Sequence, residues 1–255
     1  MTNIILCGCG GRMGQAIVRA CEASKELRVV AGVDVNADAV APACAFPVYA
    51  SVSDFPECAD VIVDFSHHTA LPSLLDYAVR TNTPLVVATT GHTEEETNLM
   101  KDASKKVAIF FSRNMSIGIN LMIELCRSAA KTLGIAFDIE IVEKHHNQKL
   151  DAPSGTALMI AEAIAEERDE TQFIYDRHAV RKKRESSEIG IHAIRGGTIV
   201  GEHDAIFAGK DEIVTISHTA TSREVFAEGA LRAAAYLAGK SAGLYNMSDL
   251  IREQA

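Results

Sequence analysis

The first half of the chain alternates short apolar segments with longer amphipathic ones, and this alternation constrains the fold more than any other feature of the sequence. The apolar segments, which predict strands, span residues 3–7, 27–34, 59–64, 84–89 and 107–111. Helical patterns separate them near residues 14–23, 69–80 and 93–104. Strands that are apolar on both faces and joined by helices indicate a parallel sheet covered by helices on both sides. We therefore expect a doubly wound α/β domain.

The pattern changes near residue 117. A long helical pattern over residues 118–133 precedes segments that alternate between apolar and polar residues, which is typical of strands with one face in water. These segments span residues 138–143, 188–194, 199–207 and 211–220, and a polar stretch over 169–187, expected to be a partly mobile loop, lies between them. A helical pattern returns over residues 225–238. The sequence thus predicts a second, α+β domain of residues 117–224 with a mixed or antiparallel sheet, and assigns residues 1–116 and 225–255 to the first domain.

A glycine-rich loop, GCGGRMG over residues 8–14, follows the first predicted strand and opens the first helix. In this context glycines let the backbone approach a pyrophosphate at the helix N-terminus. Met13 stands where the strict G-x-G-x-x-G spacing needs glycine, so the loop is better described as Gly8-x-x-Gly11-x-x-Gly14. Arg12 can reach a phosphate or can be a solvated residue of the first turn. The loop favours a Rossmann-type dinucleotide-binding domain, with a tight turn that binds nothing as the alternative.

Asp34 bears on the choice of cofactor. It lies about 20 residues after the glycine-rich loop, at the end of the next predicted strand. A carboxylate there accepts hydrogen bonds from the adenosine ribose and repels a 2′-phosphate. Val35 and Asn36 supply no cation to hold that phosphate. Both NADH and NADPH are candidate cofactors, and we expect NADH to bind at least as well.

The stretch from Glu143 to Thr156 places several chemically active groups within fourteen positions. Two imidazoles, His145 and His146, and the amine of Lys149 precede a helix that begins near Ser154. Free backbone N–H groups and the positive end of the helix dipole suit a carboxylate or phosphate there. Taken singly, each residue could be structural: a core histidine, a solvated lysine, a plain helix cap. Together they predict a site for a small anion beside proton donors.

The overall composition argues against several classes of protein. The net charge of −9 disfavours binding of nucleic acid, and the basic run over residues 181–184 is interpreted as a solvated loop. Six cysteines without a regular framework indicate reduced thiols in a cytoplasmic protein, and the spacing of Cys7 and Cys9 does not suit a metal. No apolar run approaches the ~20 residues of a membrane span, and a strand pattern begins too early for a leader peptide. We expect a cytoplasmic, soluble protein without a metal, nucleic-acid or membrane partner.

Four motifs make the chain resemble the dihydrodipicolinate reductase (4-hydroxy-tetrahydrodipicolinate reductase) family. They are GCGGRMG at 8–14, ATTG at 88–91, NMSIGIN at 114–120 and HHNQKLDAPSGTA at 145–157, and GEH at 201–203 and SR at 222–223 also fit. The resemblance spans nearly the whole chain. It implies NAD(P)H-dependent reduction of 4-hydroxy-tetrahydrodipicolinate to tetrahydrodipicolinate in the diaminopimelate route to lysine, a homotetramer, a dinucleotide-binding first domain, and a second domain for substrate binding and oligomerisation.

Carried over by position, the resemblance implies that His145 is the acid/base residue and Lys149 the proton donor. His146, Gly155 and Thr156 would bind a small dicarboxylate substrate, the latter two at the helix start. The cofactor would be lined by Gly8, Cys9, Gly10, Gly11, Arg12, Met13, Asp34, Ala88, Thr89, Thr90, Ser112, Arg113, Asn114 and Met115. Ala88 replaces a usual glycine, and residues 112–115 replace a frequent small-aromatic pattern. Both departures lie near the expected nicotinamide, so they bear on cofactor preference.

Three alternatives are open at this point. The nearest is another two-domain NAD-dependent enzyme such as aspartate dehydrogenase, which the motif KLDAPSGT disfavours. A non-catalytic NADH sensor would have a degraded proton-donor site, whereas His145, His146 and Lys149 are all present. A zinc hydrolase lacks the needed ligand spacing.

Overall fold

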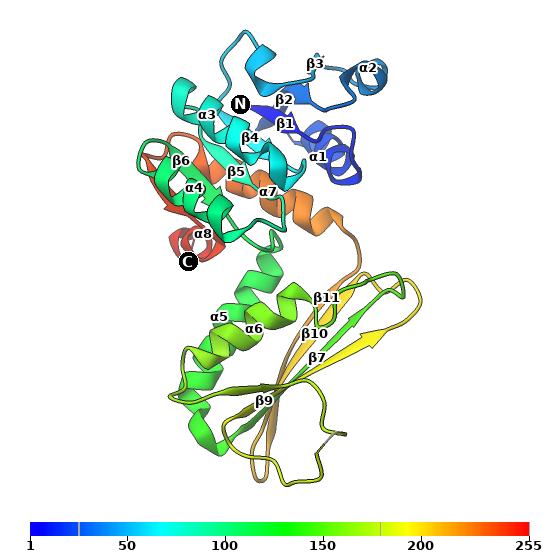
Figure 1. The fold of residues 1–255 in the computed structure, drawn as a ribbon, viewed down its shortest axis with the longest axis vertical. Helices are drawn as coiled ribbons and strands as arrows, with labels where there is room; N and C mark the ends of the chain where they lie inside the picture. Colours follow the sequence, from blue (N-terminus) through cyan, green and yellow to red (C-terminus); the bar gives the residue numbers. More distant parts are fainter. Residues whose placement is uncertain (25, 179, 255) are drawn as a thin grey trace. The chain divides into compact units, whose positions relative to one another are not determined.

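The computed structural model describes residues 1–24, 26–178 and 180–254, and it divides into two compact units (Figure 1). The first unit comprises residues 1–117 and 224–255, and the second comprises residues 118–223. Ala179 and Ala255, which fall within segments named above, lie outside the described residues.

The first unit is built on a seven-stranded sheet in the order β12-β6-β5-β4-β1-β2-β3, in which all the pairs formed by described residues are parallel. Its strands are β1 (Thr2–Cys7), β2 (Leu27–Val33), β3 (Val48–Tyr49), β4 (Val61–Asp64), β5 (Leu85–Val87), β6 (Ala108–Phe111) and β12 (Gly243–Tyr245). This topology confirms the predicted doubly wound sheet. Because β1 lies between β4 and β2, successive crossovers leave it in opposite directions, and ligands bind at such a switch point.

Helices cover both faces of this sheet. They are α1 (Arg12–Ala23), α2 (Ala37–Val40), α3 (Leu71–Thr81), α4 (Glu94–Ser104), α7 (Glu224–Leu237) and α8 (Met247–Gln254). Alternate residues of β1 enter different cores: Ile4 and Leu6 pack with residues of α1 and α7, whereas Ile5 and Cys7 pack with residues of α3. All four are at most 1% exposed, and full burial of such a side chain contributes about 1.5–3 kcal/mol. The strands are therefore apolar on both sides because each side of the sheet packs into a core.

The second unit has a five-stranded sheet in the order β11-β10-β7-β9-β8. Its strands are β7 (Asp138–His145), β8 (Gln172–Ile174), β9 (Glu188–Arg195), β10 (Gly201–Ala208) and β11 (Ile213–Ala220). β9 runs parallel to β7 and β8, and β10 runs antiparallel to β7 and β11. The sheet is thus mixed, which confirms the prediction of a second α+β domain.

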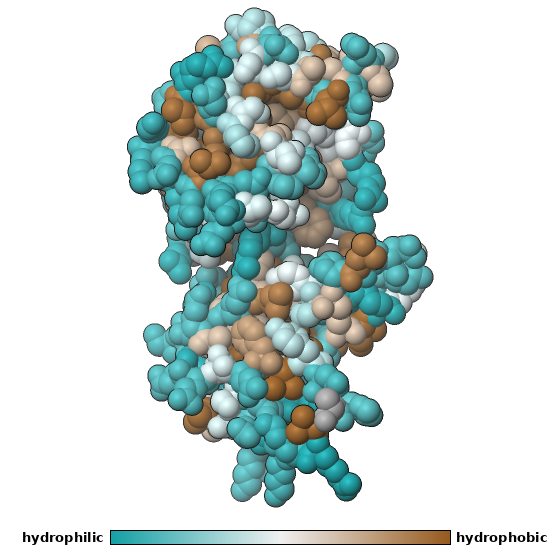
Figure 2. Space-filling model, in the orientation of Figure 1, coloured by the Kyte–Doolittle hydropathy of each residue, from teal (hydrophilic) through white to brown (hydrophobic). Residues whose placement is uncertain are grey.

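Two helices, α5 (Ile117–Leu133) and α6 (Gly155–Ala165), supply apolar side chains to the core of this second sheet. Ile139 and Ile141 of β7 are fully buried in that core, while Glu140 and Val142, which alternate with them, belong to the opposite face. Figure 2 shows hydrophilic side chains over most of the visible surface of each unit, with apolar ones in separate groups. In the part of the chain that the structure describes, no helix combines the length and apolar character needed to cross a membrane.

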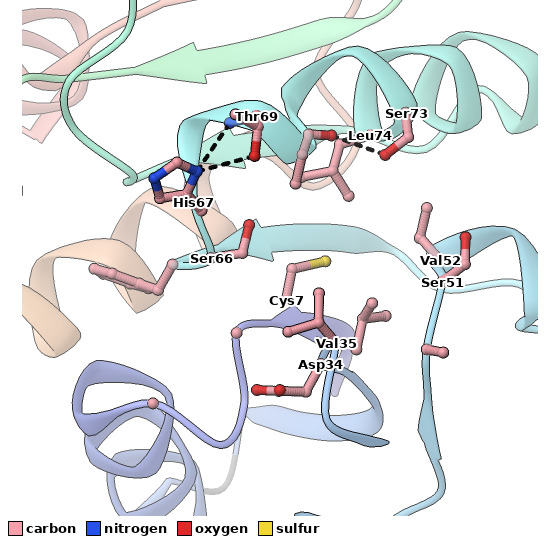
Figure 3. Close-up of a pocket in the computed structure, with 16 residues that line it drawn as sticks. Cys7, Asp34, Val35, Ser51, Val52, Ser66, His67, Thr69, Ser73 and Leu74 are labelled. Carbon is pink, nitrogen blue, oxygen red and sulfur yellow. Dashed lines mark hydrogen bonds between the residues drawn. The ribbon is translucent and has the colours of Figure 1, made fainter. Parts of the chain in front are cut away.

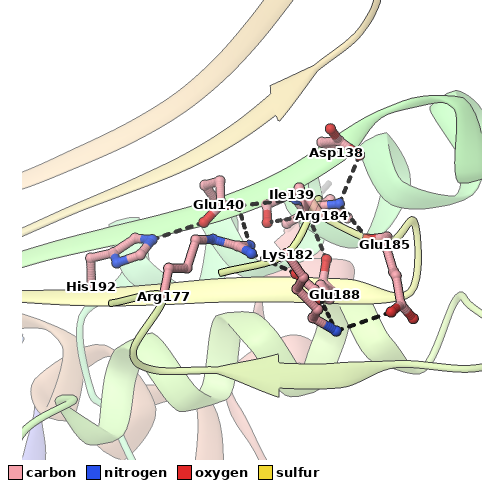
Figure 4. Close-up of polar contacts among 9 residues, drawn as sticks. All are labelled: Asp138, Ile139, Glu140, Arg177, Lys182, Arg184, Glu185, Glu188 and His192. Carbon is pink, nitrogen blue, oxygen red and sulfur yellow. Dashed lines mark hydrogen bonds and ion pairs between the residues drawn. The ribbon is translucent and has the colours of Figure 1, made fainter. Parts of the chain in front are cut away.

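The interpretation of the basic run at 181–184 as a solvated loop was wrong for Arg184. Its side chain is only 17% exposed and donates to the carboxylates of Asp138 and Glu140 and to the carbonyl oxygen of Ile139 (Figure 4). Lys182 pairs with the buried Glu188 at 3.0 Å. Since the preceding residues 172–174 also form β8, the polar stretch is attached to the sheet by strand pairing and ion pairs. The pairs of Arg184 with Asp138 and Glu140 span 46 and 44 residues, so a local charge count does not reveal them.

Candidate active site

The glycine turn joins β1 to α1 in the first unit. Gly8 has a φ of +77°, and a Cβ on it would lie 2.5 Å from the carbonyl oxygen of Phe65. A Cβ on Gly14 would lie 2.3 Å from the carbonyl oxygen of Gly8. Gly11 is the N-cap of α1 and offers no side-chain acceptor to the amides of the first turn. The turn therefore needs Gly8 and Gly14 for its own packing, and it leaves the helix N-terminus suited to an anion.

Asp34 immediately follows β2 and is attached to this turn. Its carboxylate accepts hydrogen bonds from the backbone N–H groups of Gly10 and Asn36, both at 3.0 Å. A Cβ on Gly10 would lie 2.9 Å from the carboxylate oxygen Oδ2 of Asp34, so glycine allows this close approach. The beginning of the turn and the acidic side chain are thus held in a fixed relation before any ligand binds.

A pocket of about 520 Å³ opens at the carboxyl ends of β1, β2 and β4. Its volume is in the range of small-molecule and cofactor sites. Figure 3 shows Asp34 and Val35 on one side and Ser66, His67 and Thr69 on another. The lining residues are Cys7, Gly8, Gly11, Val33, Asp34, Val35, Ala50, Ser51, Val52, Phe65, Ser66, His67, Thr69, Ala70, Ser73 and Leu74. The pocket therefore joins part of the glycine turn with Asp34 and with a polar segment that sequence reasoning missed.

That missed segment follows Asp64, the last residue of β4. Asp64 is fully buried and accepts hydrogen bonds from the backbone N–H of Ser66 at 3.0 Å and from the hydroxyl of Thr89 at 2.8 Å. Burial raises the pKa of its carboxyl group, although the hydrogen bonds from Ser66 and Thr89 oppose that effect. An acid at the end of an apolar strand was a signal that could have pointed to this segment.

The other residues predicted to line the cofactor lie at the same edge of the sheet but do not line this pocket. The side chains of Cys9, Ala88 and Met115 are at most 7% exposed and belong to the apolar core, and Met13 packs against that core. The side chains of Cys9, Ala88 and Met115 are therefore turned away from a ligand, whereas that of Met13 is partly exposed. Arg12 begins α1, Thr89 and Thr90 follow β5, and Ser112, Arg113 and Asn114 follow β6. The hydroxyl of Ser112 donates to the carbonyl oxygen of Asn114 at 2.8 Å.

In the second unit, His145 is the last residue of β7 and Glu143 lies two positions before it on the same face of the sheet. The ring nitrogen Nδ1 of His145 lies 2.6 Å from Oε2 of Glu143. Glu143 is fully buried and also accepts from both Nη atoms of Arg195 at 2.7 Å and from the backbone N–H of Ser154 at 2.9 Å. Burial alone would raise the pKa of Glu143, but the hydrogen bonds from His145, Arg195 and Ser154 outweigh it and lower the pKa to about 2. The residue is therefore an anion at neutral pH.

Ser154 is the N-cap of α6, where its Oγ accepts from the backbone N–H of Ala157 at 3.2 Å. The same oxygen lies 3.1 Å from Nε2 of His203, whose ring is 5.2 Å from the ring of His145. Burial, with His145 nearby, lowers the pKa of His203 to about 4, so this imidazole is neutral at neutral pH. The hydrogen bond between the Ser154 hydroxyl and Nε2 of His203 therefore joins two uncharged groups. Sequence reasoning did not assign a role to Glu143, Arg195 or His203.

The remaining predicted residues surround this centre. Lys149 pairs with Asp151 at 2.8 Å, and its amine contributes to the lowered pKa of His203. Gly155 and Thr156 are the first two residues of α6, and no atom would lie within 4 Å of a Cβ on Gly155. The Nδ1 atom of His146 is buried without a hydrogen-bond partner. The structure thus places two imidazoles, an amine and an open helix N-terminus in one unit. Among the described residues, no group of three or more metal-ligating side chains could hold a metal ion.

Comparisons with known proteins give a consistent result. A family model described as "Dihydrodipicolinate reductase, N-terminus" matches residues 2–115, and one described as "Dihydrodipicolinate reductase, C-terminus" matches residues 118–251. A 4-hydroxy-tetrahydrodipicolinate reductase of Caldanaerobacter subterraneus subsp. tengcongensis is 52% identical over 99% of both chains. One of Clostridium novyi is 48% identical over the full length of both.

Among solved structures, a dipicolinate-bound dihydrodipicolinate reductase from Paenisporosarcina sp. TG-14 is similar with a TM-score of 0.80 and 25% identity. The similarity covers 96% of this chain and 97% of the other. A myo-inositol dehydrogenase from Corynebacterium glutamicum shares the fold, with a TM-score of 0.59 at 16% identity over 99% of this chain and 93% of that one.

Proposed function

The chain belongs to the dihydrodipicolinate reductase family, and on that premise we propose how its own residues carry out the NAD(P)H-dependent reduction of 4-hydroxy-tetrahydrodipicolinate to tetrahydrodipicolinate. The observation that carries the proposal is the His145–Glu143 pair at the end of β7, 2.6 Å apart, beside the open N-terminus of α6. It supplies an acid/base group and an anion site within one unit.

The cofactor is proposed to bind across the carboxyl edge of the first sheet. The glycine turn and the first amides of α1 suit the pyrophosphate, and the pocket between Asp34 and the segment 66–69 suits the adenosine. The fixed Asp34 carboxylate favours ribose hydroxyls over a 2′-phosphate. We infer that NADH binds at least as tightly as NADPH.

The substrate is proposed to place a carboxylate against the start of α6. Gly155 and Thr156 supply backbone amides there, and His146 lies nearby in the sequence with an unpartnered ring nitrogen. The dicarboxylate dipicolinate in the printed name of the related solved structure supports a ligand of this kind.

The overall reaction consumes a hydride and a proton and releases the substrate hydroxyl as water. The nicotinamide supplies the hydride when bound. His145 and Lys149 are proposed to supply and relay the proton, His145 through the ring nitrogen that does not face Glu143. The Glu143 carboxylate holds Nδ1 of His145, and Lys149 contributes an amine from the loop that follows β7.

The test is NADH oxidation followed spectrophotometrically with freshly generated substrate. We expect turnover with this substrate and none with oxaloacetate plus ammonia, which the competing aspartate dehydrogenase reading would require. His145→Asn serves as the control for the site, because an Asn amide can replace the Nδ1–H donor to Glu143 but not Nε2. A reversed substrate preference would overturn the assignment.

We predict that Lys149→Ala lowers turnover by about 10²-fold or more while NADH binding stays nearly unchanged, since the loss falls on proton delivery. Steady-state kinetics together with calorimetric titration of NADH check this. An equal loss of NADH affinity would mean that the lysine is a cofactor ligand or a structural residue.

A further inference from the structure

We propose that buried Glu143 and partly buried Arg195 form a positioning pair that fixes the ring orientation and tautomer of His145 and connects it to the start of α6. The inference deepens the proposed function and rests on it, because it concerns the same acid/base residue. It adds two positioning residues to the reaction, Glu143 on β7 and Arg195 on the neighbouring strand β9.

The contacts of the Glu143 carboxylate are complete without a substrate. Oε2 accepts from Nδ1 of His145 and from Nη1 of Arg195, and Oε1 accepts from Nη2 of Arg195 and the N–H of Ser154. All four distances lie between 2.6 and 2.9 Å, and the side chain is 0% exposed. A carboxylate with four donors in place has no remaining role as a direct proton donor. It acts through His145.

Arg195 connects parts of the site that are far apart in the sequence. It is the register partner of His145 on β9, 50 residues later, and its guanidinium crosses to Glu143 in a bidentate pair. Its Nη2 also donates to the carbonyl oxygen of Asp151 at 2.7 Å, and Asp151 holds the amine of Lys149. One guanidinium therefore links the strand that carries His145 to the loop that carries Lys149.

The pair also determines which ring nitrogen of His145 exchanges a proton. An ionised carboxylate only accepts, so Nδ1 must carry a hydrogen and Nε2 is left for the substrate. Nε2 faces Gly201 of β10, where a Cβ would approach it to 3.1 Å. Glycine leaves space beside the reactive nitrogen.

The charged and titratable groups around His145 come from every neighbouring element. Glu143 lies on β7, the strand that carries His145, and Lys149 and Asp151 lie in the loop that follows β7. The neighbouring strands contribute Arg195 on β9, His203 on β10 and His218, which is opposite His203, on β11. Among the charged groups that contact the His145 ring, Glu143 is the one within hydrogen-bond distance. Neutralising Glu143 therefore removes the anionic acceptor that holds Nδ1–H of His145.

The experiment compares Glu143→Gln with Glu140→Gln. Glu140 is a matched control, since it lies three residues earlier on β7 and belongs to the opposite face. It pairs with two arginines and a histidine, where Glu143 pairs with one arginine and one histidine. We expect Glu143→Gln to lower turnover about 10- to 100-fold with the KM for NADH unchanged, and to change the pH profile of turnover, because the ring of His145 is no longer held by an anionic acceptor. Glu140→Gln should retain turnover within about twofold and keep the wild-type profile.

A spectroscopic readout separates positioning from folding. In ¹⁵N-histidine-labelled protein, the hydrogen-bonded Nδ1–H of His145 should give a downfield proton signal that is assigned by its loss in His145→Asn. The signal should vanish or shift in Glu143→Gln and persist in Glu140→Gln. An unchanged pH profile together with an unchanged His145 signal in Glu143→Gln would overturn the proposal, even where turnover falls.

The same measurements distinguish this proposal from the proposed function. Full activity in His145→Asn would remove the assigned role of His145 and with it the function as proposed. Loss of activity in His145→Asn beside wild-type turnover in Glu143→Gln would remove only the positioning role.

Discussion

At the scale of single residues, Asp34 makes the cofactor preference testable. Its carboxylate is held by two backbone amides, and Val35 beside it is 89% exposed. We predict that Val35→Arg shifts binding toward NADPH, because a cation then lies next to the position of a 2′-phosphate. Calorimetric titration of both cofactors checks this. A wild-type preference for NADPH of tenfold, about 1.4 kcal/mol, would contradict the argument from Asp34.

His203 makes a prediction about stability and pH. Its pKa falls from 6.5 to about 4 on folding, so the unfolded chain binds more protons between those values. The contribution to stability is complete above about pH 6.5 and is lost as the pH falls toward 4, up to about 3 kcal/mol in all. In His203→Gln, whose amide can still form a hydrogen bond with the Ser154 hydroxyl, the loss of unfolding free energy between pH 7 and pH 5 should be about 2 kcal/mol smaller.

Urea unfolding at both pH values and one protein concentration measures that difference. Equal losses in the wild type and the variant would mean that the His203 imidazole is not held neutral by the fold.

At the scale of elements, the turn between β1 and α1 contains glycines that differ in how much room a Cβ would have. Gly8→Ala should destabilise the protein by about 1–3 kcal/mol and weaken NADH binding, because the new Cβ meets backbone at a positive φ. Gly11→Ala, whose Cβ would meet backbone only at 3.3 Å, should be nearly neutral for stability.

Thermal unfolding and NADH titration of both variants check this order. A more severe loss of stability in Gly11→Ala than in Gly8→Ala would contradict it.

At the scale of the whole molecule, we propose a homotetramer that forms through the second sheet, on the face that does not pack against α5 and α6. In this chain the face carries apolar side chains among charged ones, and Ile194 and Ile213 are 47% and 67% exposed. Burying such side chains against a second copy is favourable. We predict a tetrameric mass by analytical ultracentrifugation, reduced in Ile213→Glu. A monomeric wild-type mass would remove the proposal.

The sequence by itself determined the elements and the motifs that depend on nearby residues. The apolar segments of the first half became parallel strands, and the stretch from 143 to 156 became a strand end followed by a capped helix, because periodicity and capping act within a few residues. The two- and three-residue strands β3, β8 and β12 were missed, since so few residues carry no period.

Only the tertiary structure decided which distant groups meet. Glu143 contacts Arg195, 52 residues later, and Ser154 contacts His203, 49 residues later, because sheet register and a shared core bring them together. In the same way, pairing of Arg184 with Asp138 across 46 residues turned an apparently solvated charge into a fixed one. Local patterns specify which face of a strand is buried, but the partner across the sheet depends on register, which is set by the packing of the whole unit.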